Sequence, residues 1–162
     1  MLCYILILAI RNIWQMSVTI HEGGCQCGSV RFTTSDTPFK VMACHCTTCK
    51  QRTGAAYGIG LYFRDEEVKF NDGERTSFTF HSETSGRWLK NEFCPKCGSA
   101  VTWTLEMRPG LRAIAGGAYD DPDWYTIECH LWTAAARSDM RYPDHVQQFE
   151  QALVAAPADS DD

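Results

Sequence analysis

Seven of the nine cysteines stand in three short clusters, and this feature constrains the fold of the 162-residue chain more than any other. The clusters lie at Cys25–Cys27, Cys44–Cys49 and Cys94–Cys97. Cysteines separated by one residue rarely form a disulfide with each other without strain, whereas thiolates at such spacings are typical of metal sites in a reducing compartment. The pattern therefore predicts a metal-stapled protein of the cytoplasm.

Four of these cysteines are predicted to form a closed structural zinc site. Cys94 and Cys97 belong to a Cys-x-x-Cys-Gly turn, in which both sulfurs converge on one metal and the glycine lets nearby N–H groups point at the thiolates. Cys25 and Cys27 supply two further sulfurs from the end of a bent strand, which completes a tetrahedral set. Iron also binds four thiolates, so the residues alone leave zinc and iron open.

The middle cluster holds three cysteines, Cys44, Cys46 and Cys49, and no fourth cysteine is reserved for it. Three protein ligands with one open position are the arrangement of a catalytic zinc, so we expect two zinc ions per chain, the second one open to a ligand. The alternative is a second structural site closed by His45, Cys129, His130 or another side chain. The middle residue of an extended Cys-x-Cys segment points away from its neighbours, which predicts a surface or supporting position for His45.

A zinc bound by thiolates favours a sulfur atom in its open position and holds an incoming thiol as the nucleophilic thiolate. The sequence therefore predicts a small-molecule thiol as the ligand. Lys50 and Arg52 follow the open cluster closely, and we expect them to contact the carboxylates of a peptide-like thiol. The alternative for both residues is a solvated charge on a short turn.

The formal net charge is −5 at neutral pH, and seven thiolates with two Zn²⁺ would bring it to about −8, since the thiolate is the metal-binding form. A negative protein is repelled by phosphate backbones and anionic membrane surfaces, so we expect neither nucleic acid nor a membrane as a partner. The apolar run Leu2–Ile10 is also far shorter than the roughly 20 residues that span a bilayer. The residues leave the oligomeric state open.

Apolar residues recur at every second position along much of the chain from Gly28 onward, which is the spacing of half-buried strands. Turn residues such as Asn71-Asp72-Gly73 separate these runs. The pattern predicts a mainly β fold of short, coiled antiparallel sheets. Two short helices are expected, one directly after Cys46 and one over Asp144–Leu153.

Residues 16–153 are predicted to form a single domain, because a chain of this length supports one core and shows no repeat or linker. Residues 1–15 are interpreted as an upstream extension, so translation is expected to start at either Met1 or Met16. Residues 154–162 are small and acidic, which predicts a disordered tail.

Three motifs, GGCQCGSVRF, CHCTTCKQRTG and FCPKCGS, follow one another over Gly23–Ser99. Together they resemble the glutathione-dependent formaldehyde-activating family, which also includes centromere protein V, and weaker similarity continues to about Phe149. The resemblance implies a β-tent-like fold with two zincs and the same division of the cysteines into a structural and a catalytic site. It also implies glutathione as co-substrate and the activity of S-(hydroxymethyl)glutathione synthase, a carbon–sulfur lyase that joins formaldehyde to glutathione.

Two functions of different classes are therefore predicted. The first is a zinc-dependent carbon–sulfur lyase that acts on a glutathione adduct or a similar thiol adduct. The second is a non-catalytic, zinc-stapled module that binds a thiol or a protein without raising a reaction rate. A distant relation to methionine sulfoxide reductases would share the scaffold, but the chain has no separate catalytic cysteine motif of that type. No phosphate loop or dinucleotide fingerprint offers another chemistry.

Overall fold

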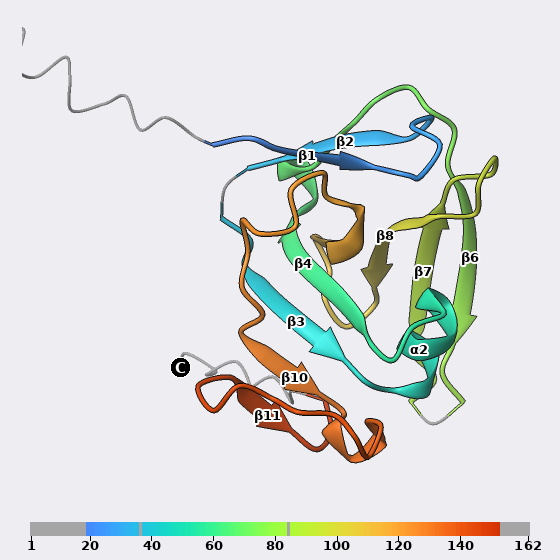
Figure 1. Cartoon of the computed structure of the whole chain (residues 1–162). Coiled ribbons are helices and arrows are strands. Elements are labelled where there is room, and N and C mark those ends of the chain that lie inside the picture. The colour runs from blue at the N-terminus through green and yellow to red at the C-terminus, as the bar shows by residue number, and fades with distance from the viewer. Residues whose placement is uncertain (1–18, 36, 84, 153–162) are drawn as a thin grey trace, which may run out of the picture.

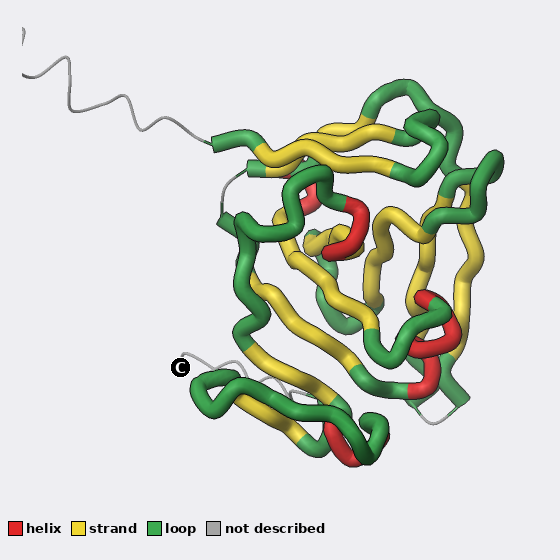
Figure 2. The backbone as a smooth tube through the Cα atoms, viewed as in Figure 1, coloured by secondary structure: helices red, strands yellow, loops and turns green. Residues whose placement is uncertain are grey.

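The computed structural model describes residues 19–35, 37–83 and 85–152, which form two β-sheets, one short α-helix and many loops (Figures 1 and 2). The predicted mainly β class is therefore confirmed. The predicted upstream extension at residues 1–15 and the predicted acidic tail at residues 154–162 lie outside the described residues.

The smaller sheet consists of β1 (His21–Gly24), β2 (Arg31–Thr34) and β5 (Lys69–Phe70). Its strands are antiparallel and lie in the order β1-β2-β5. Gly23 also pairs with Tyr119, and this close approach requires a glycine because a Cβ at position 23 would lie 2.4 Å from the carbonyl oxygen of Ala118. The contact fixes the small sheet to the segment that directly follows Gly116–Ala118.

The larger sheet contains β3 (Lys40–Cys44), β4 (Gly58–Arg64), β6 (Thr76–His81), β7 (Trp88–Phe93), β8 (Ala100–Leu105), β9 (Leu111–Ala115), β10 (Cys129–Leu131) and β11 (Gln147–Phe149). The spatial order is β11-β10-β3-β4-β9-β8-β7-β6, and Figure 1 shows the small sheet lying across one end of this larger one. From β3 to β6 all neighbours are antiparallel, as the alternation predicts. At β10 the sheet departs from that pattern, because β10 is parallel to both β3 and β11.

The helix α2 (Thr47–Thr53) confirms the helix expected after Cys46, and it is the one α-helix of the described residues. It ends at Gly54, whose φ of 65° is the left-handed conformation that favours glycine. Three 3₁₀ turns accompany it: η1 (Asp65–Glu67), η2 (Gly116–Ala118) and η3 (Thr133–Ala135).

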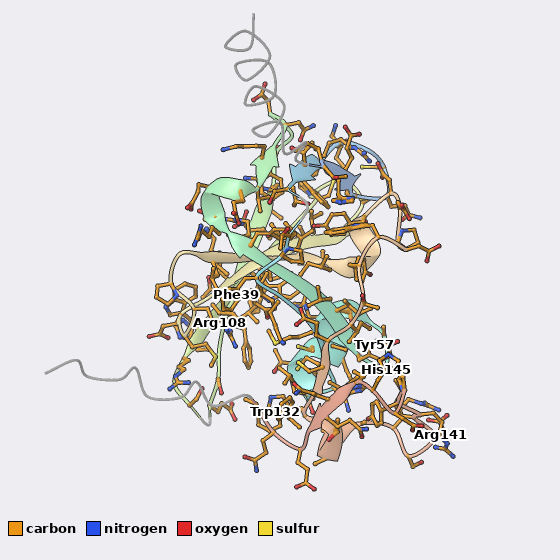
Figure 3. All side chains as sticks on the ribbon, turned by 90° about the vertical axis from the view of Figure 1, so that its left-hand side faces the viewer. Phe39, Tyr57, Arg108, Trp132, Arg141 and His145 are labelled. Atoms are coloured by element: carbon orange, nitrogen blue, oxygen red, sulfur yellow. The ribbon has the colours of Figure 1, made fainter. Side chains whose placement is uncertain are left out.

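The helix predicted over Asp144–Leu153 is wrong for every described residue of that range. Residues 147–149 form β11, which pairs with β10 over its whole length. A helix of about ten residues is marginal on its own, so the backbone hydrogen bonds offered by the edge of the large sheet outweigh its weak apolar pattern. Figure 3 shows Trp132, Arg141 and His145 at this end of the molecule.

The large sheet buries side chains on both faces. One face packs with the small sheet and contains Val41, Leu61, Phe63 and Ile114. The opposite side, which we call the Trp103 face, carries a second cluster: Met42, Tyr62, Trp103, Ala113 and Cys129. Because side chains alternate along a strand, Cys44 at the end of β3 lies on the same face as Met42.

Candidate metal centres

The seven clustered cysteines gather into two groups, and within each group all sulfur atoms lie within 4.8 Å of one another. The four-cysteine cluster consists of Cys25, Cys27, Cys94 and Cys97, and the three-cysteine cluster consists of Cys44, Cys46 and Cys49. Four sulfurs bound tetrahedrally at 2.3 Å from one zinc lie about 3.8 Å apart, so both donor sets fit a metal ion. The structure brings together the two sets expected from the sequence, and their assignment as zinc ligands stays a prediction.

The four-cysteine cluster lies where two tight turns meet. Cys27 Sγ lies 3.5 Å from Cys25 Sγ and 3.7 Å from Cys94 Sγ. The glycines that follow, Gly28 and Gly98, have φ values of 76° and 74°, a conformation that few other residues adopt. Because one turn belongs to β1 and β2 and the other to β7 and β8, a shared metal would join the two sheets.

The thiol of Cys97 is prepared for the thiolate form that binds metals. Hydrogen bonds to the hydroxyl and backbone of Ser99 lower the pKa of Cys97 to about 5. The Val30 N–H lies 3.2 Å from Cys25 Sγ and donates to it. Such backbone donors stabilise the charge of bound thiolates, which is the arrangement of a structural site.

The three-cysteine cluster is built where β3 passes into α2. Cys44 ends β3, and Cys46 caps the N-terminus of α2 by accepting a hydrogen bond from the Cys49 N–H at 3.4 Å. Hydrogen bonds from the Cys44 and Cys49 thiols, together with backbone N–H groups, lower the pKa of Cys46. Hydrogen bonding to Cys46 and Cys49, with burial, raises the pKa of Cys44.

The other side chains considered as ligands, His45, Cys129 and His130, do not contact the three sulfurs as a fourth metal ligand would. Of the two positions expected for His45, surface or supporting, the surface position is wrong, because its side chain is fully buried and its Nε2 lies 2.9 Å from Nδ1 of His130. The reason is the pairing of β10 with β3, which brings His130 against the turn. Cys129 is buried on the Trp103 face. Among the described residues, no fourth His, Cys, Asp or Glu joins the three sulfurs.

Lys50 and Arg52 both lie on α2, close to the three-cysteine cluster. The Lys50 ammonium donates to the carbonyl oxygen of Ala135 at 2.8 Å. The guanidinium of Arg52 stacks on the ring of Trp103, with its carbon 3.7 Å from the ring centroid. The expected contacts with ligand carboxylates stay a prediction.

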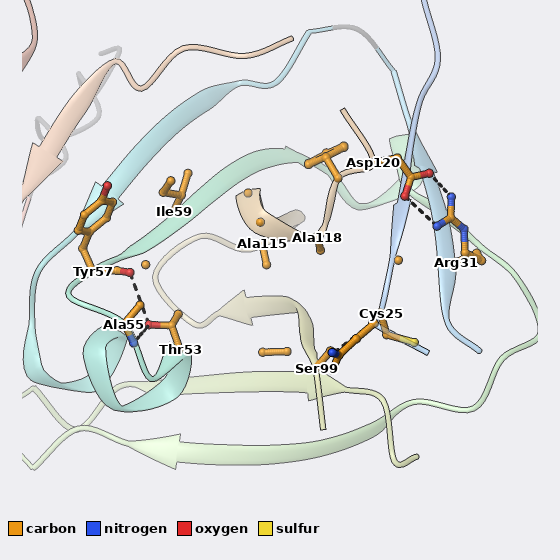
Figure 4. A pocket seen from close by; sticks show the side chains of 17 residues that line it. Cys25, Arg31, Thr53, Ala55, Tyr57, Ile59, Ser99, Ala115, Ala118 and Asp120 are labelled. Atoms are coloured by element: carbon orange, nitrogen blue, oxygen red, sulfur yellow. Dashed lines mark hydrogen bonds and ion pairs between the residues drawn. The ribbon is translucent and has the colours of Figure 1, made fainter. Parts of the chain in front are cut away.

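A pocket of about 770 Å³ reaches from one cluster towards the other. Cys25 and Ser99 line one end, while Thr53 at the end of α2 and Tyr57 in the loop after it line the other (Figure 4). Gly58 belongs to the same wall, and a Cβ at that position would lie 3.7 Å from the Cβ of Cys49. Cys25 of the four-cysteine cluster therefore lines the pocket, and the lining residue Gly58 borders Cys49 of the three-cysteine cluster.

The rim of the pocket carries an ion pair that the sequence motifs do not signal. Arg31 forms a two-fold hydrogen bond with the carboxylate of Asp120, and one of these bonds measures 2.9 Å. The guanidinium lowers the pKa of Asp120. Arg31 and Asp120 stand 89 positions apart, so only the pairing of β1 with the segment after η2 brings them together. A motif search cannot find such a pair.

The fold and the clusters define a class of β protein with two cysteine-rich centres that can hold metal ions. Within this class, the chain belongs to the family described as glutathione-dependent formaldehyde-activating enzyme, whose family model matches residues 20–135. All seven clustered cysteines lie in the matched range. The predicted family is thus confirmed, while the likeness to centromere protein V stays a prediction.

A crystal structure of a Rhodobacter sphaeroides protein is similar to this chain, with a TM-score of 0.51 and 22% sequence identity. The match covers 65% of this chain and 96% of that protein. At this level of identity the likeness shows a shared fold. In the part of the chain that the structure describes, no helix is both long and apolar enough to cross a membrane.

Proposed function

We propose that this protein is a zinc-dependent carbon–sulfur lyase of the cytoplasm that acts on a glutathione adduct or a similar thiol adduct, as S-(hydroxymethyl)glutathione synthase does. The observation that carries the proposal is the unequal division of the sulfurs, four in one cluster and three in the other. A set of three ligands leaves one position for a substrate. Membership of the family supports glutathione and formaldehyde as the reactants.

Cys44, Cys46 and Cys49 would hold the catalytic zinc, and Cys25, Cys27, Cys94 and Cys97 the structural one. When bound to three thiolates, zinc supplies a Lewis acid that keeps an added thiol deprotonated at neutral pH. The glutathione sulfur then uses a lone pair to form the carbon–sulfur bond with formaldehyde. The electron pair of the carbonyl bond moves to oxygen, which takes up one proton, and the reverse reaction breaks the same bond.

The pocket beside the three-cysteine cluster is the proposed binding site for the peptide part of the substrate. Its volume of about 770 Å³ lies in the range of small-molecule sites. The Arg31–Asp120 pair on its rim presents both charges, which complements the amino and carboxylate groups at one end of glutathione. Lys50 and Arg52 are the other proposed contacts for its carboxylates.

The test is the rate of exchange between free and glutathione-bound formaldehyde, measured by NMR against the spontaneous background. We expect the zinc-loaded wild type to exceed the background and Cys46→Ser to match it while remaining folded. If the wild type binds glutathione without exceeding the background, the non-catalytic thiol-binding module becomes the better account. If it does neither, the lyase and the glutathione-binding module are both excluded, and the protein-binding module becomes the better account.

A further inference from the structure

The guanidinium of Arg52 is partly shielded from solvent and has no carboxylate partner among the described residues. Its Nε and Nη1 atoms are shielded from solvent and have no hydrogen-bond partner among the described residues. Its flat face lies against Trp103, which is only 4% exposed. A shielded cation costs free energy unless negative charge lies nearby. We therefore expect a negatively charged group close to Arg52.

Arg112 is a second arginine whose guanidinium is largely shielded from solvent, and it offers a comparison with Arg52. Its side chain is 14% exposed, and it forms ion pairs with both Asp65 and Glu92. No carboxylate of the described residues forms an ion pair with Arg52. The difference points to the thiolates of the three-cysteine cluster as the negative charge that Arg52 faces.

The position of Arg52 on α2 supports this reading. Arg52 follows Cys49 by three residues, a spacing that places two side chains on the same side of a helix. A Cβ at Gly58 would lie 3.1 Å from Arg52 Nη2 and 3.7 Å from the Cβ of Cys49, so both side chains border Gly58.

We propose that Arg52 selects the charge of the ligand that enters the open position of the three-cysteine cluster, favouring an anionic thiolate over a neutral ligand. This inference rests on the proposed function. Three thiolates and one Zn²⁺ together carry one negative charge, and an added thiolate makes it two, whereas a neutral ligand adds none. A cation held beside the cluster stabilises the more negative state more strongly.

The stack on Trp103 holds this charge in place before any ligand arrives. A Cβ at Gly60 would lie 2.6 Å from Trp103 Cζ2, so the glycine provides the space that the indole ring occupies. Trp103 also meets the Tyr62 ring edge to face at a centroid distance of 6.3 Å. A flat guanidinium stacks on such a ring, which a lysine ammonium does not reproduce. Arg52 therefore acts as a fixed charge, and lysine would be an incomplete replacement.

The test uses the full-length protein loaded with Co²⁺, whose visible absorption reports a change of ligand. Wild type, Arg52→Gln and Arg52→Lys are titrated with 2-mercaptoethanol, which has no carboxylate, and with imidazole, which binds as a neutral ligand. Arg137→Gln, which removes an exposed arginine from its pair with Asp139, is the matched control. The unchanged bands of the four-cysteine cluster and the far-ultraviolet spectrum show that each variant is folded.

We expect Arg52→Gln to bind 2-mercaptoethanol about tenfold more weakly, a loss of about 1.4 kcal/mol, with imidazole binding changed less than about twofold. The affinity of Arg52→Lys for 2-mercaptoethanol should lie between those of the wild type and Arg52→Gln. The affinity of Arg137→Gln for this thiol should match that of the wild type. Equal losses for both ligands, or no loss for either, would overturn the role of Arg52 while leaving the open site intact. If neither ligand changes the wild-type spectrum, the open site fails, and the proposed function fails with it.

Discussion

His45 and His130 form a buried hydrogen bond, with 2.9 Å between Nε2 of the first ring and Nδ1 of the second. Burial lowers the pKa of His45, the nearby charge of His130 lowers it further, and burial lowers the pKa of His130, so the pair is neutral at neutral pH. Since His45 stands between Cys44 and Cys46, the bond ties the three-cysteine cluster to β10.

We expect His130→Ala to lower the free energy of unfolding by about 2 kcal/mol, because the buried His45 ring loses its partner. The same change should reduce the zinc content of the three-cysteine cluster. Urea unfolding and elemental analysis measure both effects. His145→Ala is the control, since His145 is exposed in the same region. Equal stability and equal zinc content in His130→Ala and His145→Ala would contradict the proposal that the His45–His130 hydrogen bond stabilises the three-cysteine cluster.

Gly60→Ala tests the packing of Trp103. The added methyl group would meet the indole ring at 2.6 Å, so the ring must move. Overpacking of this kind costs about 1–3 kcal/mol, and we expect a matching loss of stability together with a shift in tryptophan fluorescence. Gly117→Ala is the matched control, because nothing lies within 4 Å of a Cβ at that position. If the fluorescence spectrum of Gly60→Ala equals that of the wild type, the Trp103 ring is not tightly packed against position 60.

Glu92 should make the stability depend on pH. Burial alone would raise its pKa, but hydrogen bonds from Arg112 and Arg75 outweigh burial and lower the pKa below the ordinary value of 4.5. A lowered pKa in the folded state means that Glu92 contributes its stability above about pH 4.5 and loses it as the pH falls through the folded pKa.

We therefore expect Glu92→Gln to lower the free energy of unfolding at pH 7 by about 1–3 kcal/mol, with a smaller difference from wild type at pH 3. Urea unfolding across this pH range measures the difference. The exposed Glu66→Gln serves as control. A difference that stays constant or grows towards pH 3 would contradict the assignment.

Asp120→Asn tests whether the rim of the pocket binds the peptide part of the substrate. If the proposed function is correct, removing this charge should raise KM for glutathione about tenfold and leave kcat nearly unchanged, because Asp120 is proposed to bind the peptide part of the substrate and not the reacting sulfur. The rate with 2-mercaptoethanol should not change, since that thiol has no amino group. The exposed Asp123→Asn is the control. An unaltered KM for glutathione would remove Asp120 from the site.

The cysteine clusters could be predicted from the sequence because each is encoded by residues close together in the chain. The same holds for α2, whose cap and terminal glycine both lie within nine residues. β11 escaped prediction, since three residues show too little alternation to indicate a strand. The parallel pairing of β10 with β3 also joins segments far apart in sequence.

The surroundings of the clusters were harder to predict than the clusters themselves. Arg31, Tyr57 and Asp120 stand far apart in the sequence, and only the folded chain brings them to one pocket. The buried position of His45 also depends on a strand more than 80 residues away. Local spacing carries the metal chemistry, whereas tertiary contacts supply the substrate pocket.

The most direct test of the account is X-ray absorption at the zinc edge, on protein purified without thiols and measured before and after addition of glutathione. Two zincs that share seven cysteine sulfurs have an average of about 3.5 sulfur ligands each. We predict that glutathione raises this average to about four in the wild type. An average of four before addition, or one that glutathione does not change, would contradict an open zinc position that receives a thiolate.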